Sequence, residues 1–194
     1  MTRIVAGRAR GRRLVVPDGA VTRPTSDRVR EAMFSTLTSL LGDLTGMAVL
    51  DLFAGSGGLG LEALSRGAAR SVLVERDRAV ARTLRRNVDA VGLVGAEVVT
   101  GDAATYLAGN PAESFDLVLL DPPYAMPGAE VVGLLERLVS GSWLADGGVV
   151  VLERAARQPE PAWPSPLGRV RERRYGETVL WYLRESDDHD RPAG

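Results

Sequence analysis

The chain has 194 residues, of which 45% are hydrophobic, and a formal net charge of −1, which describes a globular protein with a full core. No apolar run approaches ~20 residues and the first residues lack a signal-peptide core, so we expect a cytoplasmic protein without a membrane span. There is no cysteine, no lysine and one histidine, His189. These absences exclude disulfides, thiolate metal sites and a lysine-containing P-loop, argue against a Ser-His-Asp hydrolase, and lead us to expect no bound metal.

Arginine is concentrated at the N-terminus. Residues 1–30 hold eight arginines and two acids, a balance of +6, whereas the other residues hold 16 arginines and 23 acids. Two short β-branched runs, 3–6 and 13–16, predict a β-hairpin with a basic tip that must dock on the main domain. A basic arm on an acidic body indicates contact with nucleic-acid phosphates, and a solvated charge run is the alternative. The arginines assigned to this contact are Arg8, Arg10, Arg12, Arg13, Arg28 and Arg30.

A helix is predicted to begin at Ser26 and to end at Leu41. Ser26 or Thr25 can cap it, and Asp27 suits its first turn, because acids are favourable near a helix N-terminus. Its apolar residues recur at helical spacing and form a stripe for core packing. The stripe consists of Val29, Met33, Phe34, Leu37 and Leu41.

The stretch from Val49 to Gly60 predicts a strand over 48–53, a glycine-rich turn, and a helix over 58–66. Such a turn lets the backbone approach a nucleotide-like ligand, because glycine has no side chain and adopts positive φ angles readily. Glycine required only for helix–strand packing is the competing interpretation. The candidate ligand-binding residues here are Asp51, Phe53, Ala54, Gly55, Ser56 and Gly57.

Acids also follow the next two predicted strands. Glu75 comes 24 residues after Asp51, where it can accept hydrogen bonds from ribose hydroxyls. A charge at a helix N-terminus is the alternative for Glu75, and Asp77 fits that role better. Asp102 is a candidate too, with capping of the short helix after it as the alternative. The strands are expected over 71–74 and 97–100, with a helix over 78–91 between them.

The stretch from Phe115 to Tyr124 carries the second motif. Its continuous apolar run, with a strand over 117–120, is typical of burial on both faces and leads into Asp121-Pro122-Pro123-Tyr124. The prolines stop the strand and stiffen the turn, so Asp121 and Tyr124 project from the carboxyl end of the sheet. Ligands bind at that edge in open α/β sheets, so this turn and the glycine-rich turn are expected to face one crevice.

The remaining elements complete an α/β fold. We expect a helix over 129–139, a strand over 149–153 after the turn at 146–148, and an antiparallel hairpin over 169–175 and 178–183. The arginines between Arg169 and Arg174 fit phosphate contact and ordinary solvent exposure equally well. The chain is divided into a basic extension (1–25), a main domain (26–184) and a polar tail (185–194).

The two motifs resemble those of a known enzyme class. Phe53-Ala54-Gly55-Ser56-Gly57 and Asp121-Pro122-Pro123-Tyr124 are similar to motifs I and IV of S-adenosylmethionine-dependent methyltransferases that modify exocyclic amines. With the basic hairpin and Arg23-Pro24-Thr25, nearly the whole chain resembles the bacterial 16S ribosomal RNA (guanine(966)-N2)-methyltransferase family. The resemblance implies a Rossmann-like class I methyltransferase fold: a seven-stranded, mostly parallel sheet with an antiparallel C-terminal hairpin, plus a small N-terminal β-hairpin.

The resemblance also implies a cofactor, a partner and roles for the site. S-adenosylmethionine is the expected cofactor, and 16S ribosomal RNA in an assembled or partly assembled small subunit is the expected partner of a monomeric enzyme. Asp121 and the Pro122 carbonyl would hold the amine, with Pro123 beside them and Tyr124 stacked on the base. Further cofactor contacts are assigned to Glu75 for the ribose, Asp102 and Ala103 for the adenine, and Arg23 and Thr25.

Other functions explain less of the sequence. A DNA adenine-N6 methyltransferase shares Asp-Pro-Pro-Tyr, but such enzymes usually carry a sizeable recognition domain, for which 194 residues leave no room. An NAD-dependent oxidoreductase accounts for the glycines and Glu75 and leaves Asp121–Tyr124 unexplained. A non-catalytic RNA-binding module predicts that Asp121→Ala binds RNA normally with no activity to lose.

Overall fold

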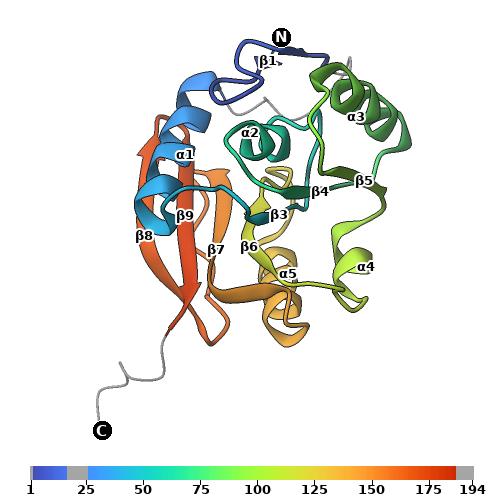
Figure 1. Cartoon of the computed structure of the whole chain (residues 1–194). Coiled ribbons are helices and arrows are strands. Elements are labelled where there is room, and N and C mark those ends of the chain that lie inside the picture. Colours follow the sequence, from blue (N-terminus) through green and yellow to red (C-terminus); the bar gives the residue numbers. More distant parts are fainter. Residues whose placement is uncertain (1, 17–25, 187–194) are drawn as a thin grey trace, which may run out of the picture.

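The computed structural model describes residues 2–16 and 26–186. A seven-stranded sheet in the order β5-β4-β3-β6-β7-β9-β8 forms its centre, and β9 pairs antiparallel with β7 and β8 while the other pairs are parallel (Figure 1). The strands are β3 (Ala48–Asp51), β4 (Arg70–Glu75), β5 (Ala96–Thr100), β6 (Phe115–Leu120), β7 (Leu144–Ala155), β8 (Leu167–Tyr175) and β9 (Thr178–Glu185). The helices are α1 (Asp27–Leu41), α2 (Gly60–Ser65), α3 (Arg78–Val91), α4 (Ala103–Leu107) and α5 (Gly128–Ser140). The predicted fold class is confirmed.

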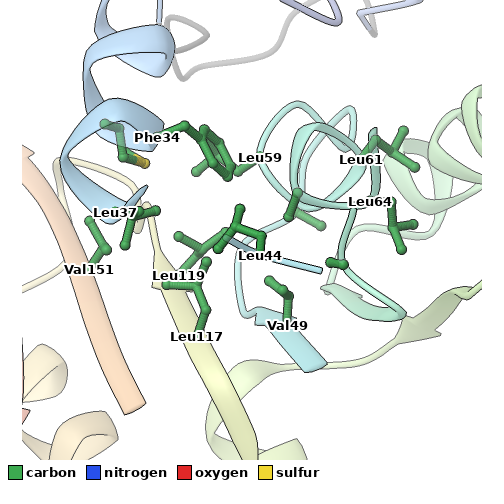
Figure 2. Close-up of a cluster of buried hydrophobic side chains, with 14 of the residues drawn as sticks. Phe34, Leu37, Leu44, Val49, Leu59, Leu61, Leu64, Leu117, Leu119 and Val151 are labelled. Atoms are coloured by element: carbon green, nitrogen blue, oxygen red, sulfur yellow. The ribbon is translucent and has the colours of Figure 1, made fainter. Parts of the chain in front are cut away.

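Alternation along the central strands divides the core into two layers, because successive side chains of a strand point to opposite faces. Val49, Leu119 and Val151 lie in the cluster beneath α1, α2 and α3, which Figure 2 shows in part. Leu50 and Leu152, one position along the same strands, belong to the cluster against α4 and α5. Full burial of such side chains is worth roughly 1.5–3 kcal/mol each, and it fixes which face every strand residue presents.

The long helices begin where the sequence indicates. Ser26 caps α1 by accepting a 3.3 Å hydrogen bond from the Val29 amide, and Asp77 caps α3 by accepting from Ala79 and Val80. These backbone bonds lower the pKa of Asp77. In the described ranges no helix is both long and apolar enough to cross a membrane.

The N-terminal hairpin is present but shorter than expected, with two-residue strands, β1 (Thr2–Arg3) and β2 (Arg13–Leu14). Beyond these strands the two sides of the arm are joined by two further backbone bonds, from the Ile4 amide to the Arg12 carbonyl and from the Gly11 amide to the Ile4 carbonyl, and the arm also bonds the main domain. The Val5 and Ala6 amides donate to Glu62 at 2.7 and 2.9 Å, and the Val15 amide donates to Asn87 at 2.9 Å. The predicted docking of the hairpin is therefore observed. The division of the chain at residues 25 and 184 stays a prediction, and residues 17–25 and 187–194 lie outside the described residues.

The strand predicted over 149–153 is longer in the structure, because β7 already begins at Leu144. The expected turn at 146–148 lies inside this strand as an irregularity. Phe115 of β6 pairs with Leu144, whereas Leu117 pairs with Val149, so β7 carries extra residues at this point. Gly147 has a φ of 71°, which lets the chain take up these residues without ending the strand.

Candidate active site

Four neighbouring parallel strands each carry an acid at or just beyond their carboxyl ends. Glu75 belongs to β4, Asp51 to β3, Asp121 follows β6, and Glu153 lies near the end of β7. The residue two positions before each acid belongs to the core cluster beneath α1–α3; these residues are Leu73, Val49, Leu119 and Val151. The alternation of strand side chains therefore places all four carboxylates on that face of the sheet. This row concentrates acidic side chains at the carboxyl edge of the sheet, which favours a cationic ligand there.

The glycine-rich turn uses its glycines for different reasons. Gly55 has a φ of 53°, and a Cβ there would meet nothing nearer than the Phe53 carbonyl oxygen at 4.0 Å, so its backbone is open to a ligand. At Gly57 a Cβ would lie 2.7 Å from a methyl group of Leu84. At Gly60 it would lie 2.3 Å from a methyl group of Leu73, so this glycine permits close packing of α2 on β4. In this turn Gly55 therefore leaves space that a ligand could approach, whereas Gly57 and Gly60 are required by close packing.

Among these four acids Asp51 is buried beneath the glycine-rich turn, and the residue is only 1% exposed. Its Oδ2 accepts a 3.0 Å hydrogen bond from the Gly60 amide, and its Oδ1 has no hydrogen-bond partner among the described residues. Burial raises the pKa of Asp51 to about 7, and the charges of Asp121 and Glu75 add to this while the Gly60 bond opposes it. Asp51 therefore fixes the start of α2 through its bond to the Gly60 amide.

Glu75 is the last residue of β4, and Asp102 lies two residues beyond the end of β5. The two oxygens of Glu75 accept hydrogen bonds from the backbone amides of Gly55 at 3.0 Å and Asp77 at 2.8 Å, so its carboxylate is held against the glycine-rich turn. Asp102 is exposed, and its Oδ1 caps α4 by accepting from Ala104 and Thr105. The capping alternative considered for Asp102 is thus what the structure describes. Ala103, the other residue assigned to the adenine, is buried.

The Asp121–Tyr124 turn follows β6 and leaves the sheet at the same edge as the glycine-rich turn after β3. Pro122 is buried and Asp121 is half-buried, whereas Tyr124 is 38% exposed. The Tyr124 carbonyl accepts a 2.8 Å hydrogen bond from Gln158, which ties the turn to the segment after β7. Burial raises the pKa of the Tyr124 hydroxyl, the Thr178 side chain opposes the shift, and the charges of Glu153 and Asp121 add to it. An aromatic face and two carboxylates therefore meet at this end of the sheet.

The exposed arginines assigned to RNA contact fall into two groups. Arg8 donates to the Leu64 carbonyl at 3.1 Å and Arg12 to the Ala90 carbonyl at 3.0 Å, so these two side chains bind the C-terminal ends of α2 and α3. Arg10, Arg13 and Arg28 are also exposed, and no hydrogen bond or ion pair to the described residues is recorded for them. These three are better placed for an external anion.

Arg30 is the exception among the arginines assigned to RNA contact, because it is buried, with 1% of its surface exposed. Its guanidinium lies 2.7 Å from Asp27 and 3.7 Å from Glu62, and burial lowers its pKa. The prediction that Arg30 contacts RNA is wrong. The missed signal is helical spacing: Arg30 precedes Met33 and Phe34 by three and four residues and therefore shares their buried stripe.

Two buried acids, Glu62 beneath the arm and Glu153 at the sheet edge, were not among the predicted residues. Glu62 is buried in α2, where it binds the arm, Arg30 and Arg66. The sequence feature that could have indicated its burial is its position as a lone acid within the apolar run of that helix. Glu153 follows the apolar run of β7 as Asp121 follows that of β6. The rule that selects acids at strand ends would therefore also have selected Glu153. Arg23 and Thr25, assigned to the cofactor, lie outside the described residues. Among the described residues no cluster of three or more acidic or histidine side chains could hold a metal ion.

A family model described as "Conserved hypothetical protein 95" matches residues 2–184 of the chain. The chain belongs to this family. Ribosomal RNA small subunit methyltransferase D of Escherichia coli K12 is 39% identical over 191 residues, covering 95% of this chain and 90% of the relative. The protein of the same name from Haemophilus influenzae is 36% identical over 160 residues, covering 81% and 80%.

The same likeness holds in three dimensions. The solved structure of yhhF from Escherichia coli superposes with a TM-score of 0.83 at 35% identity and covers 94% of this chain and 97% of that one. The Conserved hypothetical protein 95 match includes the N-terminal arm as well as the C-terminal hairpin, so the arm is part of the family's common sequence. The predicted membership in a family of ribosomal RNA methyltransferases is confirmed.

Proposed function

We propose that this protein transfers a methyl group from S-adenosylmethionine to the N2 amine of a guanine in 16S ribosomal RNA, guanine 966 by resemblance. The observation that carries the proposal is the position of two turns. The glycine-rich turn after β3 and the Asp121–Tyr124 turn after β6 leave adjacent, paired strands at the same edge of the sheet. A cofactor on one turn and an acceptor on the other would be neighbours. The names of the relatives support ribosomal RNA as the substrate.

The crevice has the chemistry that S-adenosylmethionine requires. The cofactor supplies, when bound, a methyl group on a positively charged sulfur, and the row of carboxylates favours such a cation. Glu75 would hold the ribose, and the open backbone at Gly55 leaves space for the methionine portion. Asp102 and Ala103 would border the adenine. Phe53, Ala54, Ser56 and Gly57 complete the turn around the cofactor, and Arg23 and Thr25 remain assigned to it.

The Asp121–Tyr124 turn would prepare the acceptor. An exocyclic amine is a weak nucleophile because its lone pair is delocalised into the ring. Asp121 and the Pro122 carbonyl can each accept one N–H bond, which increases electron density on the nitrogen and orients it. Tyr124 can stack on the base, a contact worth roughly 1–3 kcal/mol. The extra proton of the methylated nitrogen can then leave to Asp121 or to water.

The decisive experiment measures transfer from methyl-labelled S-adenosylmethionine to small ribosomal subunits lacking the modification, to protein-free 16S RNA and to duplex DNA. We expect label at guanine N2 in ribosomal RNA and a loss of at least about 100-fold in Asp121→Ala. Asp89→Ala removes an exposed carboxylate on α3 and should retain full activity. Label confined to adenine in DNA would overturn the substrate assignment. Hydride transfer with a nicotinamide cofactor, without methylation, would overturn the reaction.

A further inference from the structure

The end of β7 carries a buried arginine, Arg154, which is only 3% exposed. It follows Glu153, and alternation along the strand turns it to the face opposite the four carboxylates, together with Leu152. Its partner in β9, Val179, belongs to the same core cluster as Leu152. A guanidinium in these surroundings loses its hydration, and this burial lowers the pKa of Arg154.

Core packing does not explain this cation. Arg154 forms no ion pair within the described part of the chain, and no neighbouring acid raises its pKa. Its Nη2 donates a 2.8 Å hydrogen bond to the Met126 carbonyl, and its Nη1 has no hydrogen-bond partner in the described ranges. A buried charge with one bond to a neutral acceptor costs stability, and an apolar side chain of similar volume would suit the core better. The bond to Met126 therefore needs another explanation.

This bond reaches the segment that joins the Asp121–Tyr124 turn to α5. Met126 lies two residues beyond the turn, and its amide donates to the Pro123 carbonyl at 2.8 Å. Helix α5 begins here without a side-chain cap, because the residue before it is Pro127, whose side chain has no hydrogen-bond acceptor. Arg154 thus anchors this segment from a neighbouring strand.

A second side chain holds the same turn from the segment after β7. Gln158 donates through Nε2 to the Tyr124 carbonyl at 2.8 Å, and its Oε1 accepts from the Ala155 amide at 3.3 Å. The backbone amide of Gln158 donates to the Ala155 carbonyl at 2.9 Å, so this side chain is itself fixed to the end of β7. Tyr124 and Ala155 both line a cavity of about 590 Å³. The bonds of Gln158 therefore set the spacing between two of its walls.

On the basis of the proposed function, we propose that Arg154 and Gln158 are positioning residues that hold the Asp121–Tyr124 turn where methyl transfer requires it. Arg154 acts through the Met126 carbonyl and Gln158 through the carbonyl of the turn itself, so both act through the backbone rather than on the acceptor. The turn must place the amine in line with the methyl group, and a displacement of about 1 Å can cost about 100-fold in rate. This role explains why a buried arginine stands where an apolar residue would be more stable.

The test compares Arg154→Met and Arg154→Lys in methyl transfer to small ribosomal subunits lacking the modification. Methionine fills the space without a donor, whereas lysine keeps a donor and the charge. We expect Arg154→Met to lower kcat about 10- to 100-fold and to leave KM for the subunit nearly unchanged, because phosphate contacts supply much of the affinity for RNA. Arg154→Lys should recover part of kcat. The melting temperature of Arg154→Met should stay within about 4 °C of wild type, because the cost of the buried cation disappears together with its bond.

Amide hydrogen exchange, followed by NMR, tests the position of the turn without any methyl transfer. The Met126 amide should exchange faster in Arg154→Met than in the wild-type protein, and Arg154→Lys should restore part of its protection. Gln158→Met should lower kcat as well. The double variant should lose less than the product of the two single losses, because both bonds hold one turn.

Arg184→Met is the matched control, because Arg184 also donates to a backbone carbonyl, that of Leu40 in α1, at 2.6 Å and near the other end of β9. It should alter neither kcat nor the exchange of the Met126 amide. Wild-type kcat in Arg154→Met would overturn the proposal, and so would single losses that multiply in the double variant. A larger fall in melting temperature, with weakened S-adenosylmethionine binding, would show that Arg154 maintains the fold instead. If the wild-type protein methylates no ribosomal RNA, the proposed function fails, while exchange of the Met126 amide still tests the anchor.

Discussion

Asp51 is the residue whose titration the fold changes most clearly. Burial raises its pKa from 3.8 to about 7, so between these values the folded protein keeps a proton that the unfolded chain has released. The Asp51 contribution to the free energy of unfolding therefore falls as pH rises through this window, by at most about 1.4 kcal/mol per pH unit. Asp51→Asn should lack this decline. Urea unfolding between pH 4 and 8 measures this pH dependence of stability, with Asp89→Asn as an exposed control. Parallel curves of unfolding free energy against pH for Asp51→Asn and wild type would contradict the raised pKa of Asp51.

Arg28 and Arg30 form a matched pair on α1, because the first is exposed and the second is buried against Asp27 and Glu62. Arg30→Ala removes one member of a buried ion-pair cluster and should lower the free energy of unfolding by about 3 kcal/mol. Arg28→Ala should change stability by less than about 0.5 kcal/mol and weaken RNA binding. Chemical denaturation and RNA titration of both variants separate the two roles. Equal stability losses would show that Arg30 is not buried in solution.

The arm is joined to α3 and to the glycine-rich turn by one side chain, Asn87. Asn87 accepts from the Val15 amide at 2.9 Å and donates to the Val15 and Ser56 carbonyls at 2.9 and 2.8 Å, so it joins the arm to the glycine-rich turn. Asn87→Ala leaves these groups without partners, at a cost of about 1–3 kcal/mol. Amide exchange over residues 4–15 should accelerate while β3 stays protected, and the exposed change Asn110→Ala should alter neither. Unchanged exchange of the arm would mean that other contacts suffice.

The sequence predicts elements well where local pattern decides them. The strands of the parallel sheet are apolar runs and α3 begins at its capping residue, so β6 and α3 lie close to their predicted ranges. The arm strands were predicted too long because their backbone bonds Glu62 and Asn87, partners more than 50 residues away that no local pattern reveals. The start of β7 was missed because glycines at 147 and 148 usually end a strand, whereas here they form an irregularity within it.

The site is predictable to the extent that it follows strand ends. Asp51, Glu75 and Asp121 were found because each closes an apolar run, and the rule that ligands bind at this edge brings them together. The burial of Asp51 and of Arg30 was not found, because burial depends on which helix packs above, and that is a property of the tertiary structure. Glu153 also follows an apolar strand, as Asp121 does. It was not predicted because no neighbouring prolines make it part of a recognisable motif.

Charge separates the whole molecule into two working regions. The carboxyl edge of the sheet gathers acids from four strands, while the arm above α2 and α3 carries four exposed arginines, Arg8, Arg10, Arg12 and Arg13 (Figure 1). We expect a cationic cofactor to bind at the acidic sheet edge and a polyanion to bind at the basic arm. The two ligands therefore do not compete for the same charged surface. The net charge of −1 conceals the uneven distribution, because residues 1–30 carry +6 and the 16 arginines and 23 acids of the remaining residues carry −7.

Salt dependence of RNA binding tests this division directly. Each phosphate neutralised by an arginine adds about 0.7–0.9 to the slope of log K against log salt concentration, because a bound counterion is released. Arg10→Ala and Arg13→Ala should each reduce the slope by about that amount and weaken binding most at low salt. Arg137→Ala, an exposed arginine of α5 on the opposite face of the sheet, should leave the slope unchanged. If all three variants shift the slope equally, RNA is bound by diffuse charge, and the arm is not its contact surface.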